Sequence, residues 1–417
     1  MSTNNKGRIC IVVVGDIGRS PRMQYHALSM LEEGYDVEII GYQGSQPVEK
    51  LRTSNNVKFN YIYSCPEFKN FLPNVLAHFV KVLWQIITIF IALLISNHPD
   101  YVLVQNPPAV PVLGVCFIFC KVFKSKFVID WHNYAYTILS LSLGEKHLLV
   151  RISKWFEFYF GRKSDANICV TKAMKKDLME NHGINAVVFY DRPPDFFKET
   201  TVEQKHLLFS KLGIEYDVFV NGCEKNETVF TRRLPDSTIV LREERPAFVV
   251  SSTSWTEDED FSVLLSALEE YENAKSASEP LPSLICAITG KGPLKEFYSD
   301  IIRRKNWKHV TVITPWLEAN DYPTFLGSAD LGICLHKSSS GLDLPMKVVD
   351  MFGCSVPVCA ITFECLPELV EHKENGFIFS DSEELFENMK YLLFRFPEGR
   401  LTVFRGLKKN IEKFRSL

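Results

Sequence analysis

The sequence lacks the cysteine patterns that mark a metal site or a disulfide framework. Its 417 residues include eleven cysteines, none of them in a Cys-x-x-Cys pair, and no histidine and cysteine cluster has the spacing of metal ligands. An odd number of cysteines without a framework favours reduced thiols, which persist in compartments that face the cytosol. We therefore predict a protein that faces the cytosol and binds no metal.

A strong charge of either sign is also missing. Lysine and arginine number 47 and aspartate and glutamate number 50, so the net charge is −3. Nucleic-acid-binding domains carry a basic patch or stripe and a high isoelectric point. The charge balance excludes a large basic field, and we expect no nucleic-acid partner.

The sequence has no apolar run long enough to be an unambiguous membrane span. It starts with "MSTNNKGRICIVVVGD", which predicts a first strand and a glycine turn rather than a signal peptide. Residues 75–95, "VLAHFVKVLWQIITIFIALLI", are the most apolar, but His78 and Lys81 interrupt them and a span needs about 20 apolar residues. Three interpretations stay open: a core helix, a helix lying in the membrane interface, and a true span.

The sequence does contain a regular alternation of short apolar segments with amphipathic ones. Apolar strands separated by crossover helices predict a parallel sheet that is covered on both faces. The strands predicted in the first half are 8–16, 36–42, 101–108, 126–134, 166–171 and 186–194. Those predicted in the second half are 246–255, 283–290, 309–316, 331–336, 356–361 and 376–380.

The alternation breaks once, at residues 199–245, which are polar and irregular. The chain is also too long for one ordinary core. We therefore predict two doubly wound α/β domains, 1–195 and 246–417, joined by a linker with a mobile insertion over 196–245. Ligands of such domains bind beyond the carboxyl ends of the strands, so polar residues there are the site candidates.

The first strand ends in "GDIGRS", residues 15–20, which is a glycine turn leading into a helix. Gly15, Gly18 and Arg19 lie where backbone amides and the helix N-terminus can hold an anion. The spacing differs from the Gly-x-Gly-x-x-Gly dinucleotide pattern. An ordinary structural turn is the alternative interpretation.

The segment "IDWHNY", residues 129–134, places His132 just beyond another strand. A histidine there can act as a general base, because imidazole titrates near working pH. Asp16 and Asp130 are rival bases. A hydrogen-bonded loop histidine without a catalytic role is the alternative.

In the second half, two strand ends carry groups suited to a phosphorylated ligand. Ser252 and Ser254 supply hydroxyls after the strand that begins this domain. The segment "ITGKGPL" places Gly290, Lys291 and Gly292 between a strand and a helix, where close backbone approach and a cation favour a diphosphate.

Two neighbouring features allow both a binding and a structural interpretation. Trp316, in "TPWL", can face a base ring or simply pack. The acidic residues at 257–260 suit the positive end of a helix dipole, so we interpret them as structural.

The stretch "SSSGLDLPMKVVDMFG" follows a further strand and leads into a helix that starts at a proline. Its candidate ligand-binding residues are Ser340, Gly341, Asp343, Pro345, Lys347 and Asp350. A cation in the first helical turn opposes the helix dipole, and this local conflict indicates a function for Lys347. Asp343 can bind sugar hydroxyls, and Asp350 can orient Lys347, bind a ribose or be an ordinary helix residue.

These motifs together resemble a known family. The segment "LPELVEHKENGFIF", residues 366–379, and the two α/β halves are similar to those of GT-B glycosyltransferases. From about residue 8 to residue 395, the order of motifs resembles the chitobiosyldiphosphodolichol beta-mannosyltransferase family. The segments that carry this resemblance are "VVVGDIGRSPRMQYHALSM", "QNPPAVP", "VIDWHNYAY", "VVSSTSWTEDEDF", "ITGKGPL", "TPWLEANDYP" and "SSSGLDLPMKVVDMFGC".

The resemblance implies a fold and a reaction. Two Rossmann-like domains would face each other across a cleft. GDP-α-mannose would donate the first mannose, in β1,4 linkage and with inversion, to GlcNAc2-diphosphodolichol in lipid-linked oligosaccharide synthesis for N-glycosylation. The implied location is the cytosolic face of the endoplasmic reticulum membrane. No cofactor or metal is expected beyond the donor substrate, and other transferases of the pathway are candidate partners.

The resemblance also assigns roles to residues. Lys291 and Lys347, with the loop 290–292, would bind the diphosphate, and Asp343 and Asp350 the donor hydroxyls. The loop 15–20 and His132 would lie on the acceptor side. Retaining GT-B relatives carry a glutamate pair at another spacing, so their roles are not transferred to these aspartates.

The two ends of the chain also differ from the family. Its members usually begin with a membrane anchor, whereas this chain starts at the first strand, so residues 75–95 are expected to hold the lipid-linked acceptor. The chain stops at "KNIEKFRSL", where the family continues into a helical tail. Two alternatives stay open: a GT-B transferase with another acceptor, and an inactive paralogue that binds other transferases of the pathway.

Overall fold

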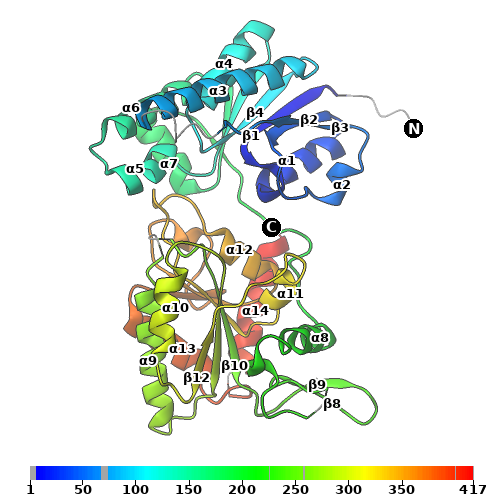
Figure 1. Ribbon diagram of the computed structural model, residues 1–417, viewed down its shortest axis with the longest axis vertical. Helices are drawn as coiled ribbons and strands as arrows, with labels where there is room; N and C mark the ends of the chain where they lie inside the picture. The colour runs from blue at the N-terminus through cyan, green and yellow to red at the C-terminus, as the bar shows by residue number, and fades with distance from the viewer. Residues whose placement is uncertain (1–5, 67–73, 225, 257–258, 400, 417) are drawn as a thin grey trace. The chain divides into compact units, whose positions relative to one another are not determined.

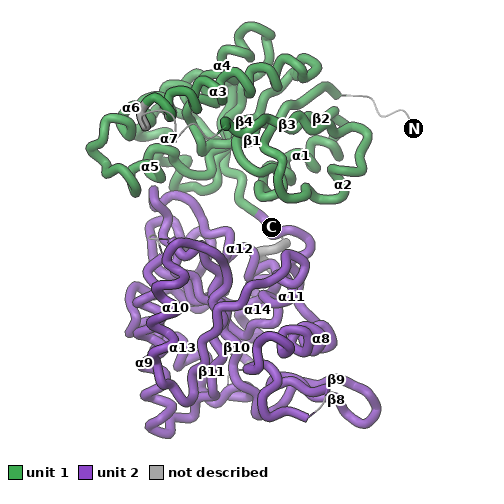
Figure 2. The backbone as a smooth tube through the Cα atoms, in the orientation of Figure 1, with its two compact units in different colours: residues 1–191 green, residues 192–417 purple. Residues whose placement is uncertain are grey.

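A computed structural model describes residues 6–66, 74–224, 226–256, 259–399 and 401–416. The chain divides into two compact units, residues 1–191 and residues 192–417 (Figure 2). Each unit contains one parallel β-sheet with helices packed against it (Figure 1). The alternation in the sequence therefore predicted the architecture of both halves correctly.

The sheet of unit 1 has seven strands in the order β3-β2-β1-β4-β5-β6-β7, and all neighbours are parallel. The strands are β1 (Arg8–Asp16), β2 (Asp36–Tyr42), β3 (Val57–Ile62), β4 (Tyr101–Asn106), β5 (Lys126–Trp131), β6 (Ala166–Cys169) and β7 (Val187–Val188). The strand order reverses between β1 and β4, which is where doubly wound sheets bind ligands.

Two predictions about the edges of this sheet were wrong. The strand β3 was missed, because "VKFNYI" is a partly exposed edge strand without a continuous apolar run. The strand predicted over 186–194 has only two residues in the sheet, and an irregular segment that ends unit 1 follows it.

The helices of unit 1 pack on both faces of the sheet. They are α1 (Pro21–Glu32), α2 (Glu49–Arg52), α3 (Asn74–Ile95), α4 (Val112–Phe123), α5 (Ala135–Leu143), α6 (Leu148–Gly161) and α7 (Lys172–His182), with a 3-10 turn η1 (Ile17–Arg19) before α1. Ile9, Ile11 and Val13 of β1 join Met23 and Ala27 of α1 in one buried cluster. Helix α1 begins at Pro21, directly after Ser20, and a proline suits the first helical position.

Helix α3 covers the apolar stretch whose interpretation was left open. Ile89 and Leu93 are fully buried, and the helix packs against α4. Ile87 and Ile91, by contrast, are nearly half exposed. In the described ranges, no helix is both long enough and apolar enough to cross a membrane.

Unit 2 contains a six-stranded parallel sheet in the order β12-β11-β10-β13-β14-β15, and a two-stranded hairpin. Its strands are β8 (Thr231–Arg233), β9 (Ile239–Leu241), β10 (Ala247–Ser252), β11 (Leu284–Thr289), β12 (Val310–Ile313), β13 (Leu331–Cys334), β14 (Val358–Ile361) and β15 (Gly376–Phe379). Its helices are α8 (Val202–Leu212), α9 (Phe261–Ser276), α10 (Lys295–Arg303), α11 (Tyr322–Leu326), α12 (Met346–Gly353), α13 (Ser382–Leu393) and α14 (Leu401–Ser416), with 3-10 turns η2 (Asp217–Phe219) and η3 (Leu366–Glu368).

The prediction that residues 199–245 are irregular was wrong. Thr201 and Gln204 form a capping box that starts helix α8, and a hairpin of β8 and β9 follows. The rings of Phe209 and Phe230 lie 5.3 Å from the ring of Phe248 on β10. These aromatic contacts join the segment to the sheet of unit 2, whereas its polar composition had indicated a linker.

Candidate active site

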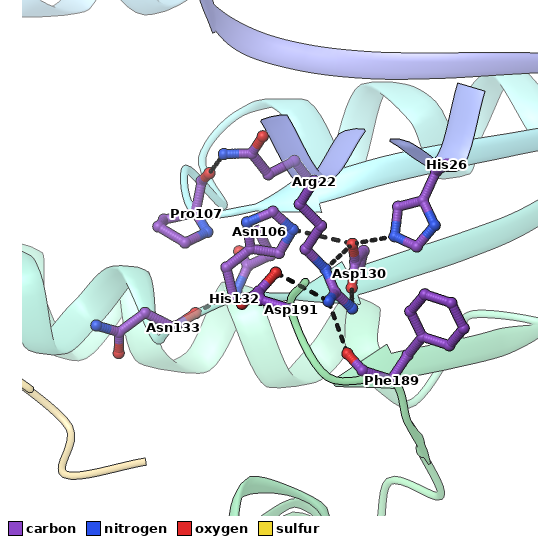
Figure 3. Close-up of polar contacts among 10 residues, drawn as sticks. Arg22, His26, Asn106, Pro107, Asp130, His132, Asn133, Phe189 and Asp191 are labelled. Atoms are coloured by element: carbon purple, nitrogen blue, oxygen red, sulfur yellow. Dashed lines mark hydrogen bonds and ion pairs between the residues drawn. The ribbon is translucent and has the colours of Figure 1, made fainter. Parts of the chain in front are cut away.

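The residues predicted at the site form two groups, one in each unit. In unit 1, Asp130 lies near the carboxyl end of β5 and is fully buried. Its carboxylate accepts hydrogen bonds from Arg22 Nε (2.8 Å), Arg22 Nη2 (2.9 Å), His26 Nε2 (2.9 Å) and His132 Nε2 (2.9 Å) (Figure 3). Arg22 and His26 are four residues apart on α1, so both side chains leave the same face of the helix.

This arrangement fixes the charge of Asp130 and the tautomer of its histidines. Burial by itself would raise the pKa of Asp130, but His132, His26 and Arg22 hold it well below its usual range. An ionised carboxylate only accepts hydrogen bonds, so Nε2 of His132 carries a hydrogen. In the neutral ring, Nδ1 of His132 is then the nitrogen with the lone pair. The His132 side chain is 23% exposed, whereas Asp130 is fully buried.

Arg22 also holds the segment that ends unit 1. Its Nη1 donates to the carbonyl oxygen of Phe189 at 2.6 Å and to Oδ1 of Asp191 at 3.1 Å (Figure 3). The guanidinium therefore connects α1, the end of β5 and residues 189–191. Sequence reasoning missed Arg22, His26 and Asp191, because no local pattern shows that Arg22 and His26 meet at Asp130 or that Asp191 contacts Arg22.

The loop that carries His132 is supported by two buried side chains. The His132 backbone N–H donates to the carbonyl oxygen of Asn106 at 2.8 Å, and Nδ2 of Asn106 donates to Glu157 at 2.5 Å. Glu157 also accepts hydrogen bonds from the N–H groups of Ala135 and Tyr136, which begin helix α5. Burial raises the pKa of Glu157 to about 7. Neither Asn106 nor Glu157 was predicted, although the position of Asn106 at the end of a buried strand was a usable signal.

Asp16 shapes the turn "GDIGRS". It accepts hydrogen bonds from the N–H groups of Gly18 (2.9 Å) and Ser45 (2.8 Å), and Arg19 lies 3.6 Å away. Partial burial by itself would raise the pKa of Asp16, but the hydrogen bonds from Ser45 and Gly18 outweigh it, so the pKa is lowered. Gly18 packs so closely against Ser45 that a Cβ would overlap the Ser45 backbone, whereas a Cβ on Gly15 would make only ordinary contact with the Val13 side chain at 3.9 Å. The carboxylate of Asp16 is therefore engaged in holding the turn.

In unit 2, the loops after β10 and β11 are in close contact. A Cβ on Gly290 would overlap the carbonyl oxygen of Thr253, and a Cβ on Gly292 would overlap that of Ser254. Gly290 also has a φ of +123°, which only glycine adopts readily. The Ser252 hydroxyl lies 2.7 Å from that of Tyr322. The two glycines therefore allow the loop 290–292 to lie directly on the loop that follows β10.

The cationic candidates of unit 2 both have partners. The ammonium of Lys291 lies 3.6 Å from the ring centre of Trp316, whose side chain is 54% exposed. Lys347, in the first turn of α12, forms an ion pair with Glu259. Glu259 precedes α9, which begins at Phe261, so its interpretation as a first-turn helix residue was wrong. Residues 257 and 258 lie outside the described part of the chain.

The loop before α12 is held by its own side chains. The Ser338 hydroxyl hydrogen-bonds to Asp343, and Gly341 has a φ of +75°. The Ser340 hydroxyl accepts a hydrogen bond from the Leu342 N–H at 3.2 Å. Helix α12 begins at Met346, with Pro345 at the N-cap, one residue later than predicted. Asp350 is the fifth residue of the helix, on its second turn, and is half-buried. Among the described residues, no group of histidine, cysteine and carboxylate side chains is arranged to hold a metal ion.

The two units match two family models. Residues 22–190 match the model described as "Glycosyltransferase Family 4", and residues 245–394 match "Glycosyl transferases group 1". Two solved structures share the fold over 98% of this chain and 94% of theirs, each with a TM-score of 0.65. They are HepE from Anabaena with UDP-glucose, 15% identical, and sucrose-phosphate synthase from Thermosynechococcus elongatus, 10% identical. The chain is thus a glycosyltransferase of the GT-B fold.

Curated relatives narrow the class further. The chain is 49% identical to the human chitobiosyldiphosphodolichol beta-mannosyltransferase, over 98% of this chain and 89% of that protein. The mouse protein of the same name is 47% identical, over 97% and 85% of the two chains. The Arabidopsis thaliana protein named UDP-glycosyltransferase TURAN is 43% identical, over 97% and 92%. The chain belongs to the chitobiosyldiphosphodolichol beta-mannosyltransferase family.

The close contact of the two loops in unit 2 can be tested with Gly290→Ala. The new methyl group would overlap the Thr253 backbone and disfavour the positive φ. We expect the free energy of unfolding, measured by urea denaturation, to fall by roughly 3 kcal/mol or more.

The matched control is Gly144→Ala, where φ is also positive, at +80°, but the space around the new methyl group is open. It should lose only about 1 kcal/mol of stability, from backbone strain alone. Equal losses for the two variants would contradict the close approach.

Proposed function

We propose that this protein transfers a mannose from GDP-mannose, in β1,4 linkage, to GlcNAc2-diphosphodolichol, as the first mannose of the lipid-linked oligosaccharide for N-glycosylation. The observation that carries the proposal is 49% identity over 98% of the chain to a protein whose name states this acceptor and linkage type. The acceptor is a lipid, so the reaction takes place at a membrane, and we propose the cytosolic face of the endoplasmic reticulum, which is the location that the family resemblance implies.

The group around Asp130 supports a role for His132 as the general base. Inversion requires one displacement at the anomeric carbon, in which the acceptor hydroxyl oxygen forms a bond to that carbon as the bond to GDP breaks. The hydroxyl proton then moves to Nδ1 of His132, and GDP leaves with the electron pair of the broken bond. Asp130 holds the ring through Nε2 and stabilises its charged form, which is the part a buried carboxylate plays beside a catalytic histidine. Asp16 is the less suitable base, because hydrogen bonds to the turn lower its pKa.

The loops of unit 2 support a role in binding the donor. Lys347 and Lys291 provide positive charge for the diphosphate and for the GDP that leaves. The glycines at 290 and 292 allow close approach of backbone amides to phosphate oxygens. Trp316 is exposed enough to stack on a base ring, and Asp343 and Asp350 can accept hydrogen bonds from donor hydroxyls.

An exposed apolar layer in unit 1 supports contact with a membrane. Helix α3 packs on α4, α4 packs on α6, and α5 packs on α6 (Figure 1). Large apolar side chains that are more than two-fifths exposed on these helices are Leu76, Phe79, Leu83, Ile87, Ile91, Leu94, Ile95, Ile118, Val122, Ile138, Leu141, Leu148, Leu149, Ile152 and Trp155. The exposed charged residues of the four helices are Lys81, Lys121, Arg151 and Lys154, and the only acidic residue in them is the buried Glu157. Apolar side chains with a cationic fringe suit the interface of an anionic lipid surface.

The reaction is tested by incubating the purified chain with labelled GDP-mannose and a phytanyl-linked GlcNAc2 diphosphate. We expect a trisaccharide lipid from which β-mannosidase releases the label, because inversion of the α-linked donor gives a β-mannoside. UDP-sugars are run in parallel, because one relative is named a UDP-glycosyltransferase. Transfer from a UDP-sugar alone would replace the donor assignment. GDP binding without any transfer would favour the non-enzymatic scaffold.

The base is tested with His132→Ala, which should lower kcat by about 100- to 10,000-fold while the donor KM changes little. Added imidazole should restore part of the rate, because it can take the proton in the vacated space. Asp130→Asn should also lower kcat strongly, since an amide does not stabilise the charged ring. Asp16→Asn is the control, and we expect it to keep kcat within about 3-fold. If Asp16→Asn abolished turnover while His132→Ala did not, Asp16 would be the base.

The membrane surface is tested by flotation with liposomes that contain phosphatidylserine. Wild type should float with the liposomes, and Ile152→Glu with Trp155→Glu should stay at the bottom, because two charges then enter the apolar layer. Leu207→Glu is the matched control, because Leu207 is 66% exposed on α8 in unit 2, and this variant should float like wild type. Flotation of the Ile152/Trp155 double variant at the wild-type level would contradict the proposed surface.

A further inference from the structure

Glu259 is a buried carboxylate that contacts two separate parts of the donor half. Oε1 forms the ion pair with Lys347 on α12. Oε2 accepts hydrogen bonds from the Ser254 N–H at 2.9 Å and from the Thr253 hydroxyl. The same Thr253 hydroxyl accepts the Trp255 N–H at 2.8 Å. One side chain therefore joins the loop after β10 to the start of α12.

The position of Glu259 is fixed on all sides. Its side chain is 1% exposed, and a buried carboxylate is tolerated only when it is paired and hydrogen-bonded, as it is here. Its backbone forms an isolated antiparallel bridge with His336, just beyond the end of β13. The side chain therefore has little freedom to move independently of the strand ends around it.

Lys347 depends on an anion at this place. It lies in the first turn of α12, where the helix dipole disfavours a cation. Its side chain is 22% exposed, and an ammonium carries several hydrogen-bond donors, so it can keep Glu259 and still bind a phosphate oxygen. Without the carboxylate, the long and flexible lysine side chain would have no fixed direction.

The loop that Glu259 holds is also the one on which the glycine loop lies. The carbonyl oxygens of Thr253 and Ser254 face Gly290 and Gly292 closely enough that no side chain fits between them. The conformation of the loop 253–255 therefore sets the position of the loop 290–292. Through these contacts, Glu259 controls both sets of groups assigned to the donor diphosphate.

We propose that Glu259 is a positioning residue for the donor diphosphate, which holds the Lys347 ammonium and the loop 253–255 in the binding arrangement before the donor arrives. This inference rests on the proposed function of Lys347 and the glycine loop. Arranging the groups in advance improves binding, because the donor does not have to order them. A role limited to folding the loop would not depend on whether Lys347 is present.

A double-mutant cycle separates these two roles, with Glu259→Gln, Lys347→Met and the double variant. The readouts are kcat and KM for GDP-mannose, and the Kd of GDP by calorimetry, which needs no turnover. We expect each single variant to weaken GDP binding by about 10- to 100-fold. The double variant should bind GDP more tightly than the product of the two single effects predicts, because the part of the Glu259 effect that acts through Lys347 is already lost in Lys347→Met.

Asp260→Asn is the matched control, since Asp260 is the adjacent, exposed acid that caps α9 and an asparagine can keep that cap. It should bind GDP like wild type. Glu259→Asp keeps the charge but moves it back by one methylene group, and should fall between wild type and Glu259→Gln. If Glu259→Gln does not fold, Glu259→Asp takes its place in the cycle.

Two outcomes would overturn the proposal. Wild-type GDP binding by Glu259→Gln would show that the charge of this side chain positions nothing. Where Glu259→Asp is used instead, wild-type binding would show that the reach of the side chain to Lys347 and the loop 253–255 is not needed. Full multiplication of the Glu259 and Lys347 effects would show that Glu259 acts independently of the lysine. Failure of the donor assignment itself looks different: Lys347→Met would then bind GDP like wild type, whatever the Glu259 variants do.

Discussion

The interaction on which unit 1 depends most is the compensation of the buried Asp130 charge. An ionised carboxylate without solvent is costly unless opposite charges and hydrogen bonds surround it. Arg22, His26 and His132 supply these from helix α1 and from the loop after β5. Because this requirement cannot be met locally, it fixes how α1, β5 and residues 189–191 meet at the end of the sheet.

The same principle recurs in unit 2. There the buried carboxylate of Glu259 faces Lys347 and the backbone of the loop after β10. In each unit, an inaccessible acid directs a more exposed group: His132 in one and Lys347 in the other. Both acids lie near carboxyl ends of parallel strands, where main-chain direction alone does not determine where a side chain points.

The sequence predicted the architecture well because continuous apolar strands and capped helices are local signals. It failed where the signal is weak or distant. The edge strand β3 has no continuous apolar run. Helix α8 lies in a polar stretch, and its Phe209 contacts Phe248 of β10, which is distant in the sequence. His132 and the glycines at 290 and 292 were selected as candidates because of their residue types beyond strand ends, and Lys347 because a cation in the first helical turn is unusual. The contacts of Glu259 and Arg22 were not predicted, because their partners are 88 and 108 residues away in the chain.

The contacts of Arg22 have a mechanical consequence. Asp191 is the last residue of unit 1, so the connection to unit 2 starts at a side chain that Arg22 holds. A pull or twist on that connection acts first on the Asp191 carboxylate and the Phe189 carbonyl group, then on the guanidinium, and then on Asp130. Residues 189–191 and the candidate base are thus linked through Arg22 and Asp130, so a change in the conformation of that segment reaches the carboxylate that holds His132.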